Sequence, residues 1–272
     1  MTLDPERFRS FEHAGWEGIP AGYHEAFGTL TTQAIKSLLD AVKLKKSMSF
    51  LDIACGPGYV AAAAAKRGAT VLGVDFSAAM VAQARQLHAG IEFREGDAEK
   101  LPVGNSLFEA AAMNFGLLHL GQPELALQEA HRILRSGGRF AFSVWAKPEE
   151  SAGFAIVLRA VELHGEPRVE LPEGPPFFHY SDPEECTSGL IAAGFESINV
   201  TKVAQVWRLP PGDGLFNAMK DSTVRTAGLL RAQKPTVLNK IRDEMRAALA
   251  KFTKDGQVEL PMPAWIASGI KP

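Results

Sequence analysis

Cysteine is scarce in this chain, whose 272 residues include only Cys55 and Cys186. Two thiols cannot supply the disulfide framework on which small secreted domains rely. Apolar runs are short as well, and none approaches the ~20 residues that a helix needs to cross a bilayer. The first nine residues are charged and lack the apolar segment of a secretory signal. These absences favour the reducing cytoplasm and predict no membrane span.

Neither sign of charge is in excess. Lys and Arg number 29 against 31 Asp and Glu, which gives a net charge of −2 and a pI near 6.4. General nucleic-acid binders usually carry a basic face, so we expect no nucleic-acid partner. Metal patterns such as HExxH or paired CxxC are missing too, so no metal is expected. Hydrophobic residues, at 46%, are ample for a substantial core.

The most informative stretch is an apolar strand that ends in an acid and runs into a glycine turn, FLDIACGPGY at residues 50–59. Gly56 and Gly58 have no Cβ, so the backbone can turn sharply and a ligand can lie against it. A helix that begins near Gly58 would point its free N–H groups and the positive end of its dipole at that ligand. The pattern predicts a nucleotide-like cofactor.

Two classes of cofactor fit the glycine turn. GPGYVA at residues 56–61 matches the dinucleotide fingerprint G-x-G-x-x-G/A, and Asp75 ends a second strand, where a ribose-binding acid belongs. An NAD-dependent oxidoreductase is therefore one alternative. The sequence contains no Tyr-x-x-x-Lys pair or other recognisable hydride-transfer set, which places this alternative last.

Three features favour a cationic ligand instead. Asp52 lies four residues before Gly56, where its carboxylate would repel a pyrophosphate and attract an ammonium group. A second acidic loop, residues 96–99, follows a third strand at the same sheet edge. No Lys or Arg lies in or beside the glycine loop to bind a phosphate. Acids rather than bases surround the expected site.

Further motifs follow in order along the chain, namely VLGVDFS at 71–77, EGDAEKLP at 95–102, NFGLLHL at 114–120 and EAHRILRSGGRF at 129–140. With the glycine turn, they make the chain resemble the class I S-adenosylmethionine-dependent methyltransferases, in the branch of the ubiquinone and menaquinone biosynthesis enzymes. The resemblance covers residues 25–145, and LPMPAWIASG at 260–269 looks like that family's last strand. It implies S-adenosyl-L-methionine as cofactor and S-adenosyl-L-homocysteine as its product.

The resemblance also implies a cofactor-binding set. Asp52 would hold the amino group of the methionine part, Asp75 both ribose hydroxyls, and Asp97 the exocyclic amine of adenine. Each acid has an ordinary structural alternative, since Asp52 could cap the following turn, Asp75 the following helix, and Asp97 could be a surface loop acid. The cofactor-binding candidates are Asp52, Ala54, Gly56, Gly58, Asp75, Phe76, Met80, Gly96, Asp97, Ala98, Asn114 and Phe115.

The apolar and catalytic candidates carry less information. Phe76 and Met80 would pack near the adenine or belong to ordinary core. Asn114 and Phe115 end the fourth strand, where the resemblance places the methyl-transfer centre and where backbone contact is expected. His119 is the catalytic candidate, because an imidazole that titrates near neutral pH can accept a substrate proton. Weaker candidates are Tyr23, His24, His179 and Tyr180.

Strands alternate with helix-like segments, which predicts a Rossmann-like α/β fold. We expect a seven-stranded, mostly parallel sheet with helices on both faces and helical lid insertions. The helix over 122–135 would be stopped by Gly137 and Gly138 as a C-cap. The seventh strand contains two prolines, which suit an edge or bulged strand. Strands are expected near 49–54, 70–75, 91–95, 108–114, 138–145, 198–207 and 257–268, and the other clear helix over 77–88.

We expect a single domain over residues 1–272, with two insertions that form a lid. The first insertion, 146–182, contains a helix and a proline-rich stretch, and the second, 210–256, is typical of two helices over 214–230 and 234–252. Ligands in open α/β sheets bind at the carboxyl ends of the strands, so the lid would set substrate choice there. The core would comprise 25–145, 183–209 and 257–270.

These patterns lead to the hypothesis of a small-molecule methyltransferase. The methyl group would pass from S-adenosyl-L-methionine by direct in-line displacement to an oxygen, carbon or nitrogen nucleophile. Positioning can supply much of such catalysis, so the motifs identify neither the acceptor nor an obligatory base. A protein that binds S-adenosylmethionine without methyl transfer is the second hypothesis. Either a monomer or a homodimer fits the sequence.

Overall fold

The structure, a computed structural model, describes residues 4–272 and is built around a seven-stranded sheet in the order β3-β2-β1-β4-β5-β10-β6. Neighbouring strands are parallel, except that β10 runs antiparallel to both β5 and β6. The expected fold class is confirmed. The strands are β1 (Ser49–Ile53), β2 (Thr70–Asp75), β3 (Glu92–Glu95), β4 (Phe108–Asn114), β5 (Leu134–Trp145), β6 (Glu196–Val203) and β10 (Ala264–Ile270).

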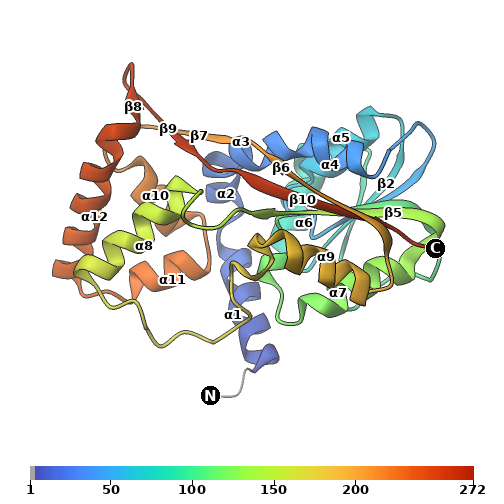
Figure 1. Ribbon diagram of the computed structural model, residues 1–272, viewed down its shortest axis with the longest axis horizontal. Helices are drawn as coiled ribbons and strands as arrows, with labels where there is room; N and C mark the ends of the chain where they lie inside the picture. The colour runs from blue at the N-terminus through green and yellow to red at the C-terminus, as the bar shows by residue number, and fades with distance from the viewer. Residues whose placement is uncertain (1–3) are drawn as a thin grey trace.

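Side chains of the central strands alternate between two apolar faces. On β4, Ala110 and Ala112 belong to one buried cluster, whereas Ala111 and Met113 belong to another. Helices α4 and α5 pack on the first face and α7 and α9 on the second, while α6 packs against β2 and β3 (Figure 1). The bounds are α4 (Ile35–Ala41), α5 (Tyr59–Lys66), α6 (Ala78–Leu87), α7 (Pro123–Ile133) and α9 (Pro183–Ala192), with short 3-10 turns η1 (Thr32–Ala34), η2 (Leu117–His119) and η3 (His179–Ser181).

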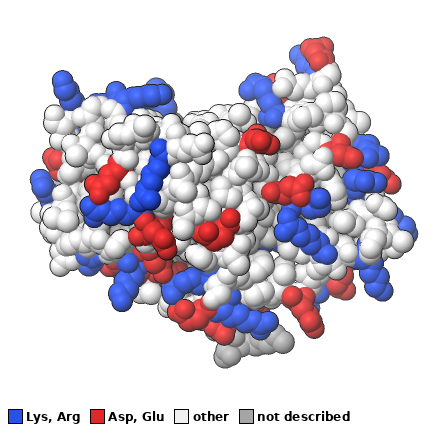
Figure 2. All heavy atoms as spheres, turned by 180° about the vertical axis from the view of Figure 1, so that it is seen from behind, with Lys and Arg blue, Asp and Glu red and all other residues white. Residues whose placement is uncertain are grey.

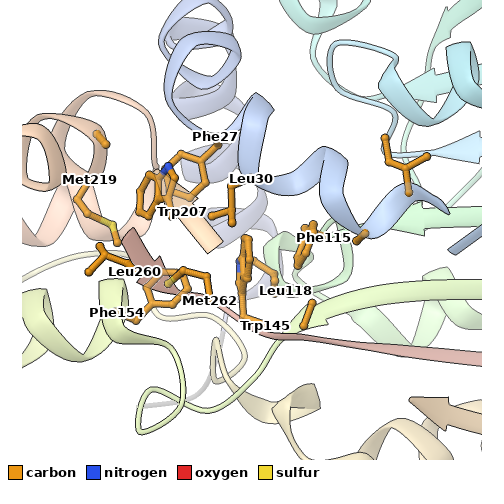
Figure 3. Packing of buried hydrophobic residues seen from close by; sticks show 14 of the residues in the cluster. Phe27, Leu30, Phe115, Leu118, Trp145, Phe154, Trp207, Met219, Leu260 and Met262 are labelled. Carbon is orange, nitrogen blue, oxygen red and sulfur yellow. The ribbon is translucent and has the colours of Figure 1, made fainter. Parts of the chain in front are cut away.

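Four helices and a small antiparallel sheet, β7-β9-β8, gather at the other end of the molecule, and we call this group the helical lobe (Figure 1). Its core is continuous with the first face of the main sheet. Trp207 and Leu260 of the lobe share a cluster with Phe115 and Trp145 at the ends of β4 and β5 (Figure 3). The lobe comprises α8 (Ala152–His164), β7 (Val206–Leu209), α10 (Gly214–Asp221), α11 (Arg225–Arg231), α12 (Pro235–Leu249), η4 (Ala250–Phe252), β8 (Thr253–Lys254) and β9 (Gln257–Pro261).

The N-terminal helices lie between the main sheet and the helical lobe (Figure 1). They are α1 (Pro5–Gly18), α2 (Pro20–Ala26) and α3 (Gly28–Thr31). Asp4 caps α1, since its Oδ1 accepts a hydrogen bond from the N–H of Arg7 at 3.1 Å. Helix α1 approaches the lobe so closely that a Cβ at Gly15 would stand 2.5 Å from Cγ1 of Val224. Helix α1 therefore separates the main sheet from the helical lobe.

Two expected strands are each divided between two sheets, so these two predictions are wrong in detail. The stretch 198–207 contains the end of β6 and the start of β7, separated at Gln205, whose buried side chain donates to the backbone carbonyl of Leu30 at 3.1 Å. The stretch 257–268 contains β9 and most of β10. Pro261 and Pro263 end the first ladder because proline has no N–H to donate. Strand β10 then lies inside the main sheet, not at its edge.

Two helix predictions also need correction. The expected helix over 214–230 is interrupted, because Thr223 bonds the backbone locally: its Oγ1 donates to the carbonyl of Met219 at 2.6 Å and accepts from the N–H of Ala227 at 3.0 Å. Gly137 does not cap α7, which ends at Ile133 and passes directly into β5. Its φ of +76° instead forms an irregularity within that strand.

Acidic and basic side chains are intermixed on the face shown in Figure 2, and neither sign forms a continuous surface there. Many charged side chains of the protein are paired, such as Arg246 with Asp213 at 2.7 Å. Within residues 4–272, no helix is long and apolar enough to cross a membrane.

Candidate active site

A cavity opens at the carboxyl ends of β1, β2 and β4, where the glycine turn and the acidic loops meet. The cavity also reaches α1, α8 and the first turn of α11, so both the main sheet and the helical lobe line it. Of the twelve cofactor-binding candidates and the catalytic candidate His119, only Gly58 is not among the lining residues. Those that line it are Asp52, Ala54, Gly56, Asp75, Phe76, Met80, Gly96, Asp97, Ala98, Asn114, Phe115 and His119.

The backbone at the cavity floor is held in the left-handed region. Gly56 has a φ of +49°, and a Cβ built there would meet no atom within 4 Å. Ala54 and Phe115, at the ends of β1 and β4, have φ of +52° and +55°. Such conformations cost non-glycine residues roughly 1–3 kcal/mol and often occur at ligand sites. The turn therefore exposes backbone, not side chain, to the cavity.

Gly58 has a packing role that the sequence did not reveal. It is the N-cap of α5 with a φ of +81°, and a Cβ there would stand 2.7 Å from Cζ of Phe93. The glycine lets the helix begin close to β3. A cofactor contact by Gly58 stays a prediction.

Asp52 is the most unusual group in the cavity. Its side chain is only 1% exposed, and Oδ2 accepts a hydrogen bond from the N–H of Ala61 at 2.8 Å. One oxygen of Asp52, Oδ2, therefore caps the segment after the turn, as the structural alternative predicted. The other, Oδ1, has no hydrogen-bond partner among the described residues. Burial, with the nearby charge of Asp75, raises the pKa of Asp52 to about 8.

Asp75 is buried beside the glycine turn. Its Oδ2 accepts from the N–H of Gly56 at 2.7 Å, and its Oδ1 accepts from the N–H of Ser77 at 3.0 Å. Ser77, not Asp75, caps α6, because its Oγ accepts from the N–H of Met80 at 3.1 Å. Burial raises the pKa of Asp75 to about 6. A carboxylate with two oxygens keeps further lone pairs for ribose hydroxyls.

The acidic loop after β3 is tied to α1. Oδ1 of Asp97 accepts from the N–H of Glu99 at 2.8 Å, and Oδ2 lies 3.4 Å from Nε of Arg9. Arg9 also pairs with the buried carboxylate of Glu99. A second cavity under α1 shares Phe76 and Asp97 with the first. This contact between α1 and the loop was not expected from sequence.

Asn114 and Phe115 have structural partners at the end of β4. The amide of Asn114 donates to the carbonyl of Thr31 at 3.2 Å and accepts from Oγ of Ser143 at 2.6 Å. Phe115 stacks on Trp145 with ring centroids 3.9 Å apart. These contacts hold the two side chains in place at the end of β4. Asn114 and Phe115 can therefore contact a cofactor through their backbone.

His119 is held by a residue that the sequence did not single out. Its Nδ1 lies 3.1 Å from Oε2 of Glu12, a fully buried carboxylate on α1. Arg225 of α11 approaches the other oxygen of Glu12, with Nε at 3.2 Å from Oε1. These three residues are more than a hundred positions apart, so no local motif could join them. Of the weaker candidates, only Tyr23 lines the cavity, not His24, His179 or Tyr180.

Aromatic side chains form much of the cavity wall. They come from the N-terminal helices, from the ends of β4 and β5 and from the first insertion, and the sequence analysis had singled out only Tyr23 and Phe115 among them. Among residues 4–272, the structure contains no cluster of three or more His, Cys, Asp or Glu side chains that could hold a metal. The aromatic wall comprises Trp16, Tyr23, Phe27, Phe115, Trp145, Phe154 and Phe177.

The residues present fit S-adenosylmethionine. The unpaired Oδ1 of buried Asp52 is an acceptor suited to an ammonium group, whose positive charge would oppose the effect of burial and lower the pKa of Asp52. The open space beside Gly56 allows a ligand to lie on the backbone. Asp75 lies where a ribose would be bound in folds of this topology.

Comparisons with known proteins agree with this fit. Residues 51–142 match a family model described as a methyltransferase domain. The demethylmenaquinone methyltransferase of Chlorobaculum parvum is 38% identical over 106 residues, which are 39% of this chain and 44% of that protein. The malonyl-[acyl-carrier protein] O-methyltransferase of Pectobacterium atrosepticum is 33% identical over 47% of this chain and 51% of that protein. The chain spans about half the length of the curated relatives it matches.

A solved structure shows the same fold over nearly the whole chain. The phosphoethanolamine N-methyltransferase 2 of Haemonchus contortus, in complex with phosphomonomethylethanolamine and S-adenosylhomocysteine, superposes with a TM-score of 0.59 at 17% identity. The match covers 97% of this chain and 60% of that one. At this identity, the likeness concerns the fold.

Proposed function

We propose that this chain, whose residues 51–142 belong to the class I S-adenosylmethionine-dependent methyltransferases, transfers a methyl group to a small-molecule acceptor. The observation that carries the proposal is the unpaired, buried Oδ1 of Asp52 beside a glycine turn with open space above it. A buried carboxylate oxygen without a partner is costly unless a ligand completes it. An ammonium group at that position supplies the missing donor.

Different residues of the cavity bind different parts of the cofactor. Asp52 holds the ammonium end, Asp75 the ribose, and Asp97, Ala98, Phe76 and Met80 the adenine end. The backbone of Ala54, Gly56, Gly96, Asn114 and Phe115 lies along the ligand between these points. S-adenosylmethionine supplies a methyl group on a positively charged sulfur. The protein orients the acceptor in line with it, and positioning of this kind contributes up to about 7–11 kcal/mol.

The helical lobe and α1 exclude water from the acceptor side of the cavity. Aromatic side chains dominate that side, and excluding water strengthens the remaining electrostatic interactions. The helices of the lobe lie within the insertions 146–182 and 210–256, whereas β7 and β9 lie just outside them. We propose that the lobe belongs to a single domain with the main sheet and selects the acceptor. Figure 3 shows its core joined to the ends of the main strands, so the wall is held firmly.

The test is calorimetric titration of the purified protein with S-adenosylmethionine, with S-adenosylhomocysteine and NADH as comparisons. We expect micromolar binding of the sulfonium ligand that is lost in Asp75→Ala. Asp182→Ala is the matched control, because Oδ1 of Asp182, like that of Asp75, accepts from the N–H two residues further on at 3.0 Å, but Asp182 lies outside the cavity. Binding of NADH alone would contradict the proposal.

A second arm separates methyl transfer from binding alone. The protein is incubated with methyl-labelled S-adenosylmethionine and a broad panel of phenols, acids, amines and enols. Formation of S-adenosylhomocysteine with a labelled acceptor supports transfer. Tight cofactor binding without any labelled product across the panel would favour the second hypothesis, a protein that binds the cofactor for another purpose.

A further inference from the structure

A buried charged cluster lies on the acceptor side of the cavity and contains none of the residues assigned to the cofactor. Three donors converge on the carboxylate of Glu12, which is fully buried. Nε1 of Trp16 donates to Oε2 at 3.0 Å, Nε of Arg225 donates to Oε1 at 3.2 Å, and Nδ1 of His119 lies 3.1 Å from Oε2. The positive charge of Arg225 compensates the carboxylate.

This arrangement selects one tautomer of His119. A carboxylate only accepts hydrogen bonds, so Nδ1 of His119 must carry the proton that it shares with Glu12. In the neutral ring, the other nitrogen, Nε2, then carries the lone pair. The ring is held in place by edge-on contacts with Trp16 and Phe177, whose centroids lie 4.7 and 5.9 Å away. His119 is thus an oriented proton acceptor in the cavity wall.

The surroundings of His119 indicate what kind of acceptor it serves. The wall is aromatic and flat side chains dominate it, which suits a planar aromatic molecule. Arg225 also lines the cavity, and its Nη2 is buried without a hydrogen-bond partner among residues 4–272. A neutral amine acceptor gains positive charge as it takes the methyl group, and that charge would face the guanidinium of Arg225. An oxygen that becomes negative would be stabilised by this guanidinium and by the positive sulfur of the cofactor.

We propose that the acceptor is an aromatic compound with an ionisable hydroxyl group and that Nε2 of His119 takes its proton. The inference rests on the proposed function. As the acceptor oxygen forms its bond to the methyl carbon, the carbon–sulfur bond breaks with its electron pair going to sulfur, and the hydroxyl proton ends on Nε2. Glu12 is a positioning residue that holds the Nδ1–H tautomer, and Arg225 compensates charge.

The first test reads the tautomer and needs no turnover. The whole chain is labelled with ¹⁵N-histidine, and the His119 signals are assigned by their absence in His119→Gln. We expect a neutral ring protonated at Nδ1 in the wild type and a mixture of tautomers in Glu12→Gln. Glu244→Gln is the matched control, because Glu244 pairs with His164 at 3.2 Å on the surface. A wild-type ring protonated at Nε2 would overturn the proposal even if the variant failed to fold.

The second test compares acceptors of the same shape. Naphthols and nitrophenols are assayed beside the corresponding naphthylamines and nitroanilines with labelled S-adenosylmethionine. We expect methylation of the hydroxyl compounds, with kcat lowered by about 10²–10⁴ in His119→Gln and by roughly tenfold or more in Glu12→Gln. His164→Gln should behave as the wild type.

The outcomes distinguish the two proposals. Labelled amines without labelled hydroxyl compounds would overturn the acceptor class and leave the methyltransferase function standing. Equal kcat in the wild type and His119→Gln would overturn the role of the histidine. If the wild-type protein does not bind S-adenosylmethionine, the proposed function itself is contradicted, whatever the tautomer of His119.

Discussion

The two sides of the cavity are built in different ways. On the cofactor side, Asp52, Gly56 and Asp75 come from one strand–turn–helix unit and the strand beside it, within 24 consecutive residues. On the acceptor side, Glu12, His119 and Arg225 come from α1, η2 and α11. The first side combines backbone conformation with carboxylates that lie close together in the sequence, and the second depends on side chains carried by distant elements. A nearly invariant ligand needs only the former, whereas acceptor choice can change with the latter.

The cores of the two halves nevertheless form one cluster, which Figure 3 shows around Trp207 and Trp145. This continuity has a consequence for stability. If the helical lobe shares its core with the main sheet, the two halves should unfold together, although only one half carries the recognised motifs.

The largest expected effect tests that shared core. Trp207 is fully buried, packs on Phe27 with ring centroids 4.5 Å apart, and donates from Nε1 to the carbonyl of Ala26 at 2.9 Å. Trp207→Ala should lower the free energy of unfolding by about 3–5 kcal/mol. Denaturation followed by tryptophan fluorescence and by circular dichroism should give one transition. Two separated transitions would show that the lobe folds independently.

Two glycine substitutions distinguish the cost of backbone strain from the loss of contact between Gly56 and the cofactor. Gly56 and Gly137 both have positive φ, +49° and +76°, and a Cβ at either would meet no atom within 4 Å. Substitution by alanine should therefore cost each about 1–2 kcal/mol of stability. Only Gly56→Ala should weaken S-adenosylmethionine binding, by roughly tenfold, since its methyl group (about 1.4 kcal/mol of lost contact) would occupy the cavity. Similar affinities in the two variants would argue against ligand contact at Gly56.

The raised pKa values on the cofactor side predict how binding depends on pH. Asp52, with a pKa of about 8, must lose its proton to pair with an ammonium group, so binding releases a proton. Affinity should rise about tenfold per pH unit from pH 6, near the pKa of Asp75, to pH 8. Calorimetry in buffers of different ionisation enthalpy measures the released proton. Asp52→Asn should bind more weakly and without this slope.

The same groups have the opposite effect on the ligand-free fold. Because the folded-state pKa of Asp52 is raised above that of an unfolded chain, the folded protein binds more protons between about pH 4 and pH 8. Stability without ligand should therefore fall as pH rises through this window. Thermal unfolding at a series of pH values checks the sign, and a rise in stability would contradict the assignment.

The last prediction concerns the contact between α1 and the acidic loop. Arg9→Met leaves the buried carboxylate of Glu99 without its partner, although Oε1 still accepts from the N–H of Gln122 at 2.8 Å. We expect a loss of about 1–3 kcal/mol in unfolding free energy. The exposed pair of Arg159 and Glu162 is the control, and Arg159→Met should change stability by less than about 0.5 kcal/mol. Equal losses would mean that burial of Glu99 is irrelevant.

Much of the fold could be predicted from local pattern, because the strands of a parallel sheet are continuous apolar runs bounded by turns. Strands β2 and β4 have the expected bounds, and α6 and α7 differ from expectation by only one or two residues at each end. The failures lie where long-range contacts decide. Gln205 and the two prolines divide continuous β patterns between two sheets, and Thr223 interrupts a helix that periodicity alone would continue.

The sequence by itself determined the cofactor side of this protein. Its glycine turn, its acids and their spacing are local, and local geometry is encoded in neighbouring residues. Only the tertiary structure decided that one oxygen of Asp52 is left without a partner and that Glu12, His119 and Arg225 meet. The physical reason is that burial and pairing of charges depend on which distant elements pack together, and packing has no signature in a single stretch of chain.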